Sequence, residues 1–182
     1  DIIMPTLIEK QVEVLERHPE VTLVSTNSFI INEDGDIKAK RKKIKISGKY
    51  DGKKIARKSI RLGNLFGEPT TVMIRKSVFS KTGYFDDAYF YVPDWDMWLK
   101  ALYHGDYYHI SEYLSKFRVS KESATTNIML KRFIKMIEND RLFLNAHKNI
   151  GKIKITKFDE IVHYFNLFTS SILKILFIRF VV

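Results

Sequence analysis

The sequence contains no cysteine, which excludes disulfide bonds and thiolate metal sites and fits a reducing compartment. Proline is also scarce, with 4 residues among 182. No apolar run reaches the roughly 20 uninterrupted residues that a membrane-spanning helix needs. The chain is long enough to bury one proper core, and its scarcity of proline agrees with a folded domain rather than a low-complexity linker.

Several motifs that hold phosphates or nucleophiles are missing. The sequence has neither GxGxxG nor GxxxxGK[ST], and it has no GxSxG elbow. These absences exclude nucleotide sites of the first two kinds and a serine nucleophile of the third. The histidines have no ligand spacing such as HxxxH, so we expect surface or boundary positions for His18, His104, His109, His147 and His163.

Basic residues are abundant and unevenly placed. The formal net charge is +10, which suggests an anionic partner such as nucleic acid, a lipid surface or a phosphorylated substrate. Eleven lysines and arginines lie between Lys38 and Lys58, together with small and turn-forming residues. This segment predicts a solvated loop, or alternatively a contact for phosphate or anionic lipid.

Hydrophobic periodicity predicts an α/β fold, in which a mixed sheet with flanking helices is followed by a helical C-terminal extension. Apolar residues at helical spacing predict a helix from Pro5 to His18, and another from Asp94 to Tyr103. The tail from Phe165 is strongly apolar but interrupted by Lys174 and Arg179. It suits an interfacial helix, or a helix packed on the domain or on a missing segment. The other expected elements are strands at 21–32, 70–74, 107–110 and 113–119, a turn at 32–35, and helices at 59–65, 76–81, 128–146 and from 157 onward.

Acidic and aromatic residues are concentrated between Gly83 and Trp98. Asp94 falls at the expected start of a helix, where it could be an N-cap that accepts hydrogen bonds from the first turn. Asp96 would then complement the helix dipole. Alternatively, a carboxylate at this position, between Trp95 and Trp98, could take a proton from a sugar hydroxyl.

The order of five segments resembles the second half of the family 2 glycosyltransferases, which are inverting enzymes of the GT-A fold. The Asp94-Trp95-Asp96-Met97-Trp98 run resembles the acidic motif whose first aspartate is the family's catalytic base. Asp1 to Pro5, with the helix after it, resembles the end of the acidic metal motif. The other three segments are Asn32-Glu33-Asp34-Gly35, Pro69-Thr70-Thr71-Val72-Met73-Ile74-Arg75-Lys76 and Gly83-Tyr84-Phe85-Asp86.

This resemblance covers residues 1–123 and leaves 124–182 as a helical extension that could associate with a membrane. Asp1 lies inside a motif, so we expect the chain to be the acceptor-side part of a longer enzyme, with the nucleotide-binding half missing. The fragment alone should be inactive. The longer enzyme would transfer a sugar from a nucleotide-sugar donor to a saccharide or lipid-linked acceptor. It is expected to be cytoplasmic, or peripheral at the inner face of the cell membrane.

The resemblance also implies roles for individual residues. Asp94 would be the base, and Mg²⁺ or Mn²⁺ would be the metal in the longer enzyme. Asp1 and Arg118 would lie near the metal and diphosphate. The acceptor would be contacted by Thr70, Thr71, Trp95, Asp96 and Trp98.

Two positions depart from the family pattern. Pro93 stands where an acidic residue usually precedes the base, and Ser120 stands where many members have a histidine. The alternative function is a non-enzymatic module that binds nucleic acid or anionic membrane through Lys38–Lys58. Nucleic acid is the less favoured partner, because Tyr50 is the only aromatic residue in that segment and stacking would be poor.

Overall fold

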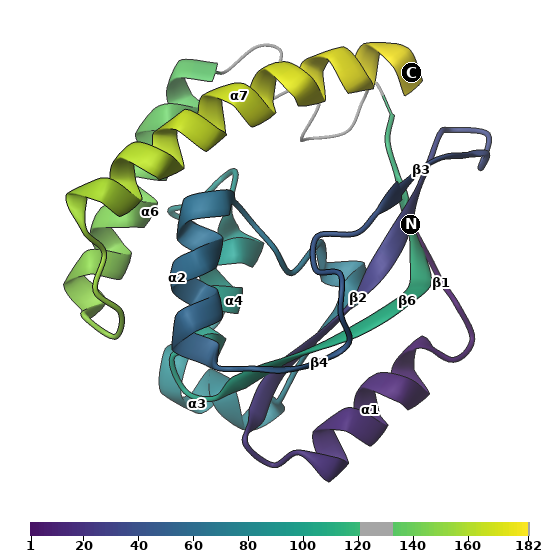
Figure 1. Cartoon of the computed structure of the whole chain (residues 1–182), viewed down its shortest axis with the longest axis horizontal. Helices are drawn as coiled ribbons and strands as arrows, with labels where there is room; N and C mark the ends of the chain where they lie inside the picture. The colour runs from purple at the N-terminus through teal and green to yellow at the C-terminus, as the bar shows by residue number, and fades with distance from the viewer. Residues whose placement is uncertain (121–132, 182) are drawn as a thin grey trace.

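Two long parallel strands form the centre of the sheet. β2 (Val21–Ile31) and β6 (Asp106–Arg118) pair along their whole lengths in a computed structural model that describes residues 1–120 and 133–181 (Figure 1). The strand expected at 21–32 is confirmed, and its run of buried residues is typical of a strand covered on both faces. The expected segments 107–110 and 113–119 are one strand. The pairing of β6 with β2 passes directly from Ile110 to Tyr113, so two residues bulge out between them.

Four shorter strands complete a mixed sheet. β1 (Ile2–Ile3) and β4 (Gly48–Tyr50) are antiparallel to β6, while β3 (Ile37–Arg41) and β5 (Val72–Ile74) are antiparallel to β2. The main path through the sheet is β1-β6-β2-β3. The turn between β2 and β3 forms at Asn32, whose side chain accepts a hydrogen bond from the backbone of Asp36 at 2.8 Å. The α/β fold class predicted from the sequence is confirmed.

Helices cover both faces of this sheet. α1 (Leu7–Arg17) packs on one face with a small core that includes Leu7, Val24 and Ile110. α2 (Gly52–Leu62) and α4 (Pro93–Leu102) lie on the other face (Figure 1). Short helical turns between the strands and α4 are η1 (Pro69–Thr71), η2 (Lys76–Val78) and α3 (Phe79–Thr82).

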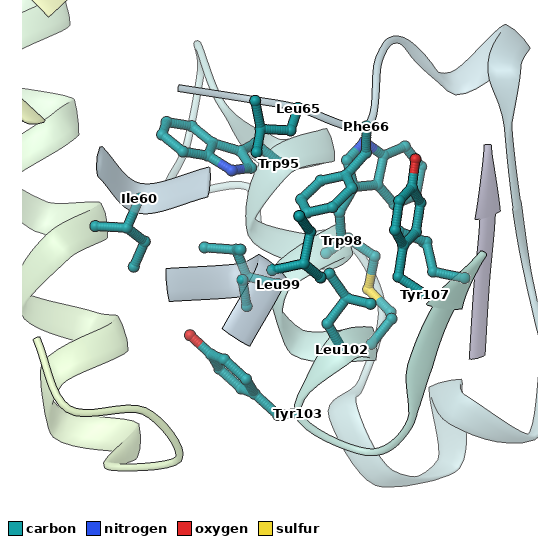
Figure 2. Close-up of a cluster of buried hydrophobic side chains, with 14 of the residues drawn as sticks. Ile60, Leu65, Phe66, Trp95, Trp98, Leu99, Leu102, Tyr103 and Tyr107 are labelled. Carbon is teal, nitrogen blue, oxygen red and sulfur yellow. The ribbon is translucent and has the colours of Figure 1, made fainter. Parts of the chain in front are cut away.

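The larger core lies between α2, α4 and the sheet, and it is rich in aromatic rings. Figure 2 shows Trp95, Trp98, Phe66 and Tyr107 among its buried side chains. The indole N–H of Trp95 donates to the hydroxyl of Ser59 at 2.8 Å, and that of Trp98 donates to the carbonyl of Gly67 at 3.1 Å. Each buried indole therefore has a partner for its polar atom, as burial requires.

The expectation of a single solvated loop at 38–58 was wrong. This basic segment contains β3, β4 and the first part of α2. Asp51 caps α2 by accepting a hydrogen bond from the backbone of Lys54 at 2.8 Å. Ile55, Ala56 and Ile60 are buried at helical spacing, and α2 begins seven residues before the helix expected from Ser59.

The extension forms a helical hairpin of α6 (Phe133–Ile150) and α7 (Lys157–Val181), and α7 crosses α2 (Figure 1). The helix expected from Lys157 onward is confirmed within the described residues. The expected start of the preceding helix at Ile128 and the boundary at 123/124 lie outside them. None of the described helices has both the length and the apolarity to cross a membrane.

Asp159 holds α7 against α2. Its fully buried carboxylate accepts hydrogen bonds from Arg57 at 2.9 Å and from the backbone and hydroxyl of Thr156, both at 2.7 Å, and it also pairs with Arg61. Burial alone would raise the pKa of Asp159, but these donors outweigh it and lower the pKa below its ordinary value of 3.8. The stabilisation is therefore complete above that ordinary value, and it is lost as the pH falls through the lower pKa of the folded state.

Replacing Asp159 with alanine should lower the free energy of unfolding by about 2 kcal/mol, because charged hydrogen bonds are lost while both arginines keep access to water. Urea denaturation followed by circular dichroism measures this change. Glu160→Ala is the matched control, since Glu160 forms a partly exposed pair with Lys148 and should contribute less than about 1 kcal/mol. Equal losses in the two variants would contradict an anchoring role for Asp159.

Candidate active site

A cleft of about 160 Å³ lies where the start of α4 meets α7. The end of α2 and one residue each from β3 and α6 complete its wall. Elements from both the sheet domain and the extension therefore build this site. The lining residues are Arg41, Leu62, Gly63, Asn64, Tyr91, Val92, Asp94, Trp95, Asp140, His163, Asn166, Leu167 and Ser170.

Asp94 is half-buried in this cleft, at the second position of α4. The N-cap position belongs to Val92 rather than to Asp94, so the capping expectation was wrong in its position. The Asp94 carboxylate still accepts a hydrogen bond from a first-turn donor, the backbone N–H of Trp95, at 2.7 Å. Pro93 opens the helix at a position where its missing N–H does no harm.

Burial raises the pKa of Asp94 from 3.8 to about 6. The hydrogen bond from Trp95 acts in the opposite direction, as does the nearby charge of Arg41, while the charge of Glu68 raises the pKa further. A carboxyl group with a pKa just below neutral is ionised at neutral pH, yet it binds a proton more readily than an ordinary aspartate. This combination suits a general base.

A partly buried ion pair lies near Asp94. Glu68 is only 6% exposed and pairs with Arg41, which comes from the end of β3. The Arg41 guanidinium also lies over the ring of Phe117, 5.2 Å from its centroid. Arg41 lies inside the basic segment, but neither it nor Glu68 was recognised from the sequence as a site residue. Arg41 adds a positive charge to the cleft wall.

A second carboxylate faces the cleft from the extension. Asp140 on α6 is fully buried, and its Oδ1 lies 3.3 Å from Nε2 of His163 on α7. The other ring nitrogen of His163 lies 2.7 Å from the carbonyl of Ile60. Burial, followed by the charges of Asp140 and Asp94, raises the pKa of Tyr91, so this phenol lies within the influence of both carboxylates. Sequence reasoning missed Asp140 and His163, because no local spacing relates residues on two different helices.

Three expected site residues meet at one end of β1. The carboxylate of Asp1 accepts hydrogen bonds from the backbone of Arg118 at 2.9 Å and from the hydroxyl of Thr70 at 3.4 Å. The guanidinium of Arg118 donates to the carbonyls of Asn32 and Glu33 in the β2–β3 turn. Thr70 follows Glu68 by two residues, so the segment around η1 connects this group with the surroundings of Asp94.

Three other residues expected to contact an acceptor are buried elsewhere. Asp96 is fully buried and pairs with Lys100 at 2.6 Å, while Nε2 of His147 lies 3.1 Å from its other oxygen. Trp98 is 2% exposed and lies in the core (Figure 2). Thr71 is 1% exposed and donates to the carbonyl of Glu68 at 2.8 Å. The core surrounds most of α4, so these three side chains do not line the cleft, and Trp95 is the tryptophan that borders it.

The expectation for the histidines also needs correction. His109, His147 and His163 are buried rather than at the surface or its boundary. Burial lowers the pKa of His109 to about 4. Each of these rings lies within hydrogen-bonding distance of a partner, the hydroxyl of Tyr107 for His109 and that of Tyr103 for His147. His109 and His147 are part of the packed interior, whereas His163 also borders the Asp94 cleft.

The cluster of Asp1, Thr70 and Arg118 offers one exposed carboxylate to a metal ion, that of Asp1. Within residues 1–120 and 133–181, no three histidine, aspartate or glutamate side chains are grouped to hold an ion. Mg²⁺ usually binds through one or two carboxylates together with substrate phosphates and water. Asp1 fits one such ligand position, and the remaining ligands would have to come from the donor and from outside the described residues.

A larger hollow of about 360 Å³ lies between α1 and β6, on the opposite face of the sheet. Its charged side chains include Lys10 and Glu112, which pair with each other, and Arg17 and Glu13, which form an i,i+4 pair. Because these charges are exposed and already paired, the hollow lacks the buried, perturbed carboxyl group that distinguishes the Asp94 cleft.

Comparison of the sequence with protein-family models and with curated proteins finds no match. The resemblance to the family 2 glycosyltransferases therefore depends on the five motifs and their order. The geometry of the Asp94 cleft is a separate observation.

Proposed function

We propose that this chain is the acceptor-side part of an inverting, nucleotide-sugar-dependent glycosyltransferase with a GT-A-type fold. The observation that supports this most is Asp94, a carboxyl group with a raised pKa in a cleft. Asp94 is also the residue that the motif order assigns as the base. The proposal concerns a longer enzyme, in which a nucleotide-binding part provides the donor site.

In the proposed reaction, Asp94 takes the proton of an acceptor hydroxyl as its oxygen attacks the anomeric carbon. The new C–O bond forms on the face opposite the leaving group, so the configuration inverts. The bond between the anomeric carbon and the diphosphate oxygen breaks, and the nucleoside diphosphate leaves with that electron pair. Arg41 lies in the cleft wall, where its positive charge would stabilise the negative charge that develops during the reaction.

The group at Asp1 is proposed to face the donor's diphosphate. Asp1 would hold Mg²⁺ or Mn²⁺, which would balance the charge of the departing diphosphate. The hydroxyl of Thr70 and the backbone of Arg118 hold the Asp1 carboxylate in place. A cytoplasmic enzyme at the inner face of the membrane agrees with the absence of cysteine and the net charge of +10.

Release of nucleoside diphosphate from sugar nucleotides by the longer enzyme tests this function. The rate should require Mg²⁺ or Mn²⁺ and should fall when the metal is chelated. Because the base must be ionised, the rate should rise about tenfold per pH unit below about pH 6 and level off above it. A rate that stays constant well below this pH would exclude Asp94 as the base, and a lack of any turnover would exclude the enzyme class.

The alternative function as a nucleic-acid-binding module has less support. The basic segment is divided among two strands and a helix, and four of its cations are paired with carboxylates: Lys38 with Asp36, Arg41 with Glu68, Lys49 with Glu20, and Arg57 with Asp159. These pairs reduce the charge available for phosphates.

A further inference from the structure

The helix α7 has two faces with different chemistry. One face contributes His163, Asn166 and Ser170 to the wall of the Asp94 cleft. The other face carries large apolar side chains at intervals of three or four residues, which places them along one stripe of the helix. Their exposed fractions lie between 46% and 68% for Phe158, Ile161, Phe165, Phe168, Ile172 and Leu176, which we call the apolar stripe.

The apolar stripe is long and mostly exposed; of its rings, that of Phe158 has the Arg61 guanidinium over it, 5.5 Å from the centroid. The stripe extends from Phe158 to Leu176, or roughly 27 Å at the usual rise per residue. Soluble domains rarely leave a contiguous apolar surface of this kind without a partner. Over its described residues α7 does not combine the length and the apolarity that a membrane-spanning helix needs. A partner that receives one helix face is therefore required.

The charges around the stripe favour an anionic lipid surface as this partner. The lysines Lys152, Lys154 and Lys157 are exposed immediately before and at the start of α7. The acidic residues of its first turn are neutralised internally: Asp159 by Arg57 and Arg61, and Glu160 by Lys148. The surface at this end of the stripe is thus positive and apolar, and three of the six stripe residues are phenylalanine. This is the composition of helices that lie in the membrane interface.

We propose that α7 docks on an anionic membrane through the apolar stripe. Resting on the proposed function, we further propose that the acceptor in the Asp94 cleft is a saccharide carried on a lipid. A helix with its side chains is about 10 Å across. If the apolar stripe lies in the membrane interface, the cleft on the other face of α7 is therefore within one helix diameter of the lipid headgroups. A sugar attached to a lipid could enter this cleft without leaving the membrane surface.

Vesicle flotation of this chain tests the docking, with phosphatidylcholine vesicles that contain or lack phosphatidylglycerol. The unmodified chain should float with the anionic vesicles. The double variant Phe165→Glu/Phe168→Glu should bind at least roughly tenfold more weakly, because two large apolar side chains no longer enter the interface. The matched control is Ile8→Glu/Val12→Glu, which makes the same change of charge on exposed positions of α1 and should bind as before.

Each other outcome would overturn the docking proposal. Equal weakening in both double variants would mean that net charge alone drives binding. Failure of the unmodified chain to float, together with a dimer that only the α7 variant dissociates, would identify a second copy of the chain as the partner. Circular dichroism checks that the variants fold. Flotation needs no turnover, so failure of the transferase proposal and failure of the docking are separate results. Transfer to a free saccharide as fast as to the same saccharide on lipid would overturn the acceptor assignment.

Discussion

Replacing Asp94 with asparagine should lower the rate of sugar transfer by about 10²–10⁴-fold, the usual contribution of a general base. Asparagine has nearly the same shape and can still accept the hydrogen bond from the backbone of Trp95, but it cannot take a proton. The measurement is release of nucleoside diphosphate by the longer enzyme, at a pH above the pKa of Asp94 and with acceptor at saturation.

Asp87→Asn is the control for this prediction. Asp87 is exposed in the loop before α4, and its replacement makes the same change of charge outside the cleft. Transfer by this variant should be within about twofold of normal, as expected of a residue that does not touch the reacting atoms. Normal turnover by Asp94→Asn would show that another group accepts the proton, and Asp140 would be the next carboxylate to replace.

The same substitution should make the protein more stable at neutral pH. The pKa of Asp94 in the folded state, about 6, lies above its ordinary value of 3.8. The stability linked to this group is therefore complete below the ordinary value, and it is lost as the pH rises through the folded-state pKa. At pH 7 the ionised group costs about 1–3 kcal/mol, which an uncharged asparagine would recover. Gain of stability with loss of activity is typical of a functional residue.

Elements with one clear period were predictable from the sequence. The apolar residues of α1 and α4 recur at helical spacing, and β2 is a nearly continuous run of β-branched residues. The prediction of a solvated loop for the basic segment was wrong because its many lysines obscure the few residues that determine its secondary structure. Ile55 and Ile60 provide a buried stripe and Asp51 a cap, but these signals are sparse within eleven cations.

The candidate site was only partly predictable for a related reason. Asp94 was found because it lies in a short motif of consecutive residues. Such a motif can be recognised in the sequence without knowledge of the rest of the fold. Asp140 and His163 enter the cleft through the packing of α6 and α7, which no spacing records. Asp96 and Trp98 were assigned to the acceptor because they share that motif. The sequence does not show that α4 is enclosed on most sides and that its neighbouring side chains point into different surroundings.

Replacing Asp96 with alanine should lower the free energy of unfolding by about 3–5 kcal/mol, the range for removing one partner of a buried ion pair. The change leaves Lys100, whose side chain is 18% exposed, and the fully buried His147 without their carboxylate. Such a loss is a large fraction of the stability of an ordinary domain. Urea denaturation of the purified chain measures it.

Two comparisons separate a structural role of Asp96 from contact with an acceptor. Asp94→Ala makes the same replacement two residues earlier and should not lower stability at neutral pH, because it removes a carboxylate whose ionised form is disfavoured by burial. Asp96→Asn keeps an oxygen toward His147 and should lose less stability than Asp96→Ala. If Asp96→Ala unfolded at the same urea concentration as the unmodified chain but raised the KM for acceptor in the longer enzyme, Asp96 would contact the acceptor as the family motif suggests. We expect Asp96→Ala to be strongly destabilised, and Asp94→Asn to be stabilised but inactive. These two results together would show that Asp96 holds α4 to α6, whereas Asp94 performs the chemistry.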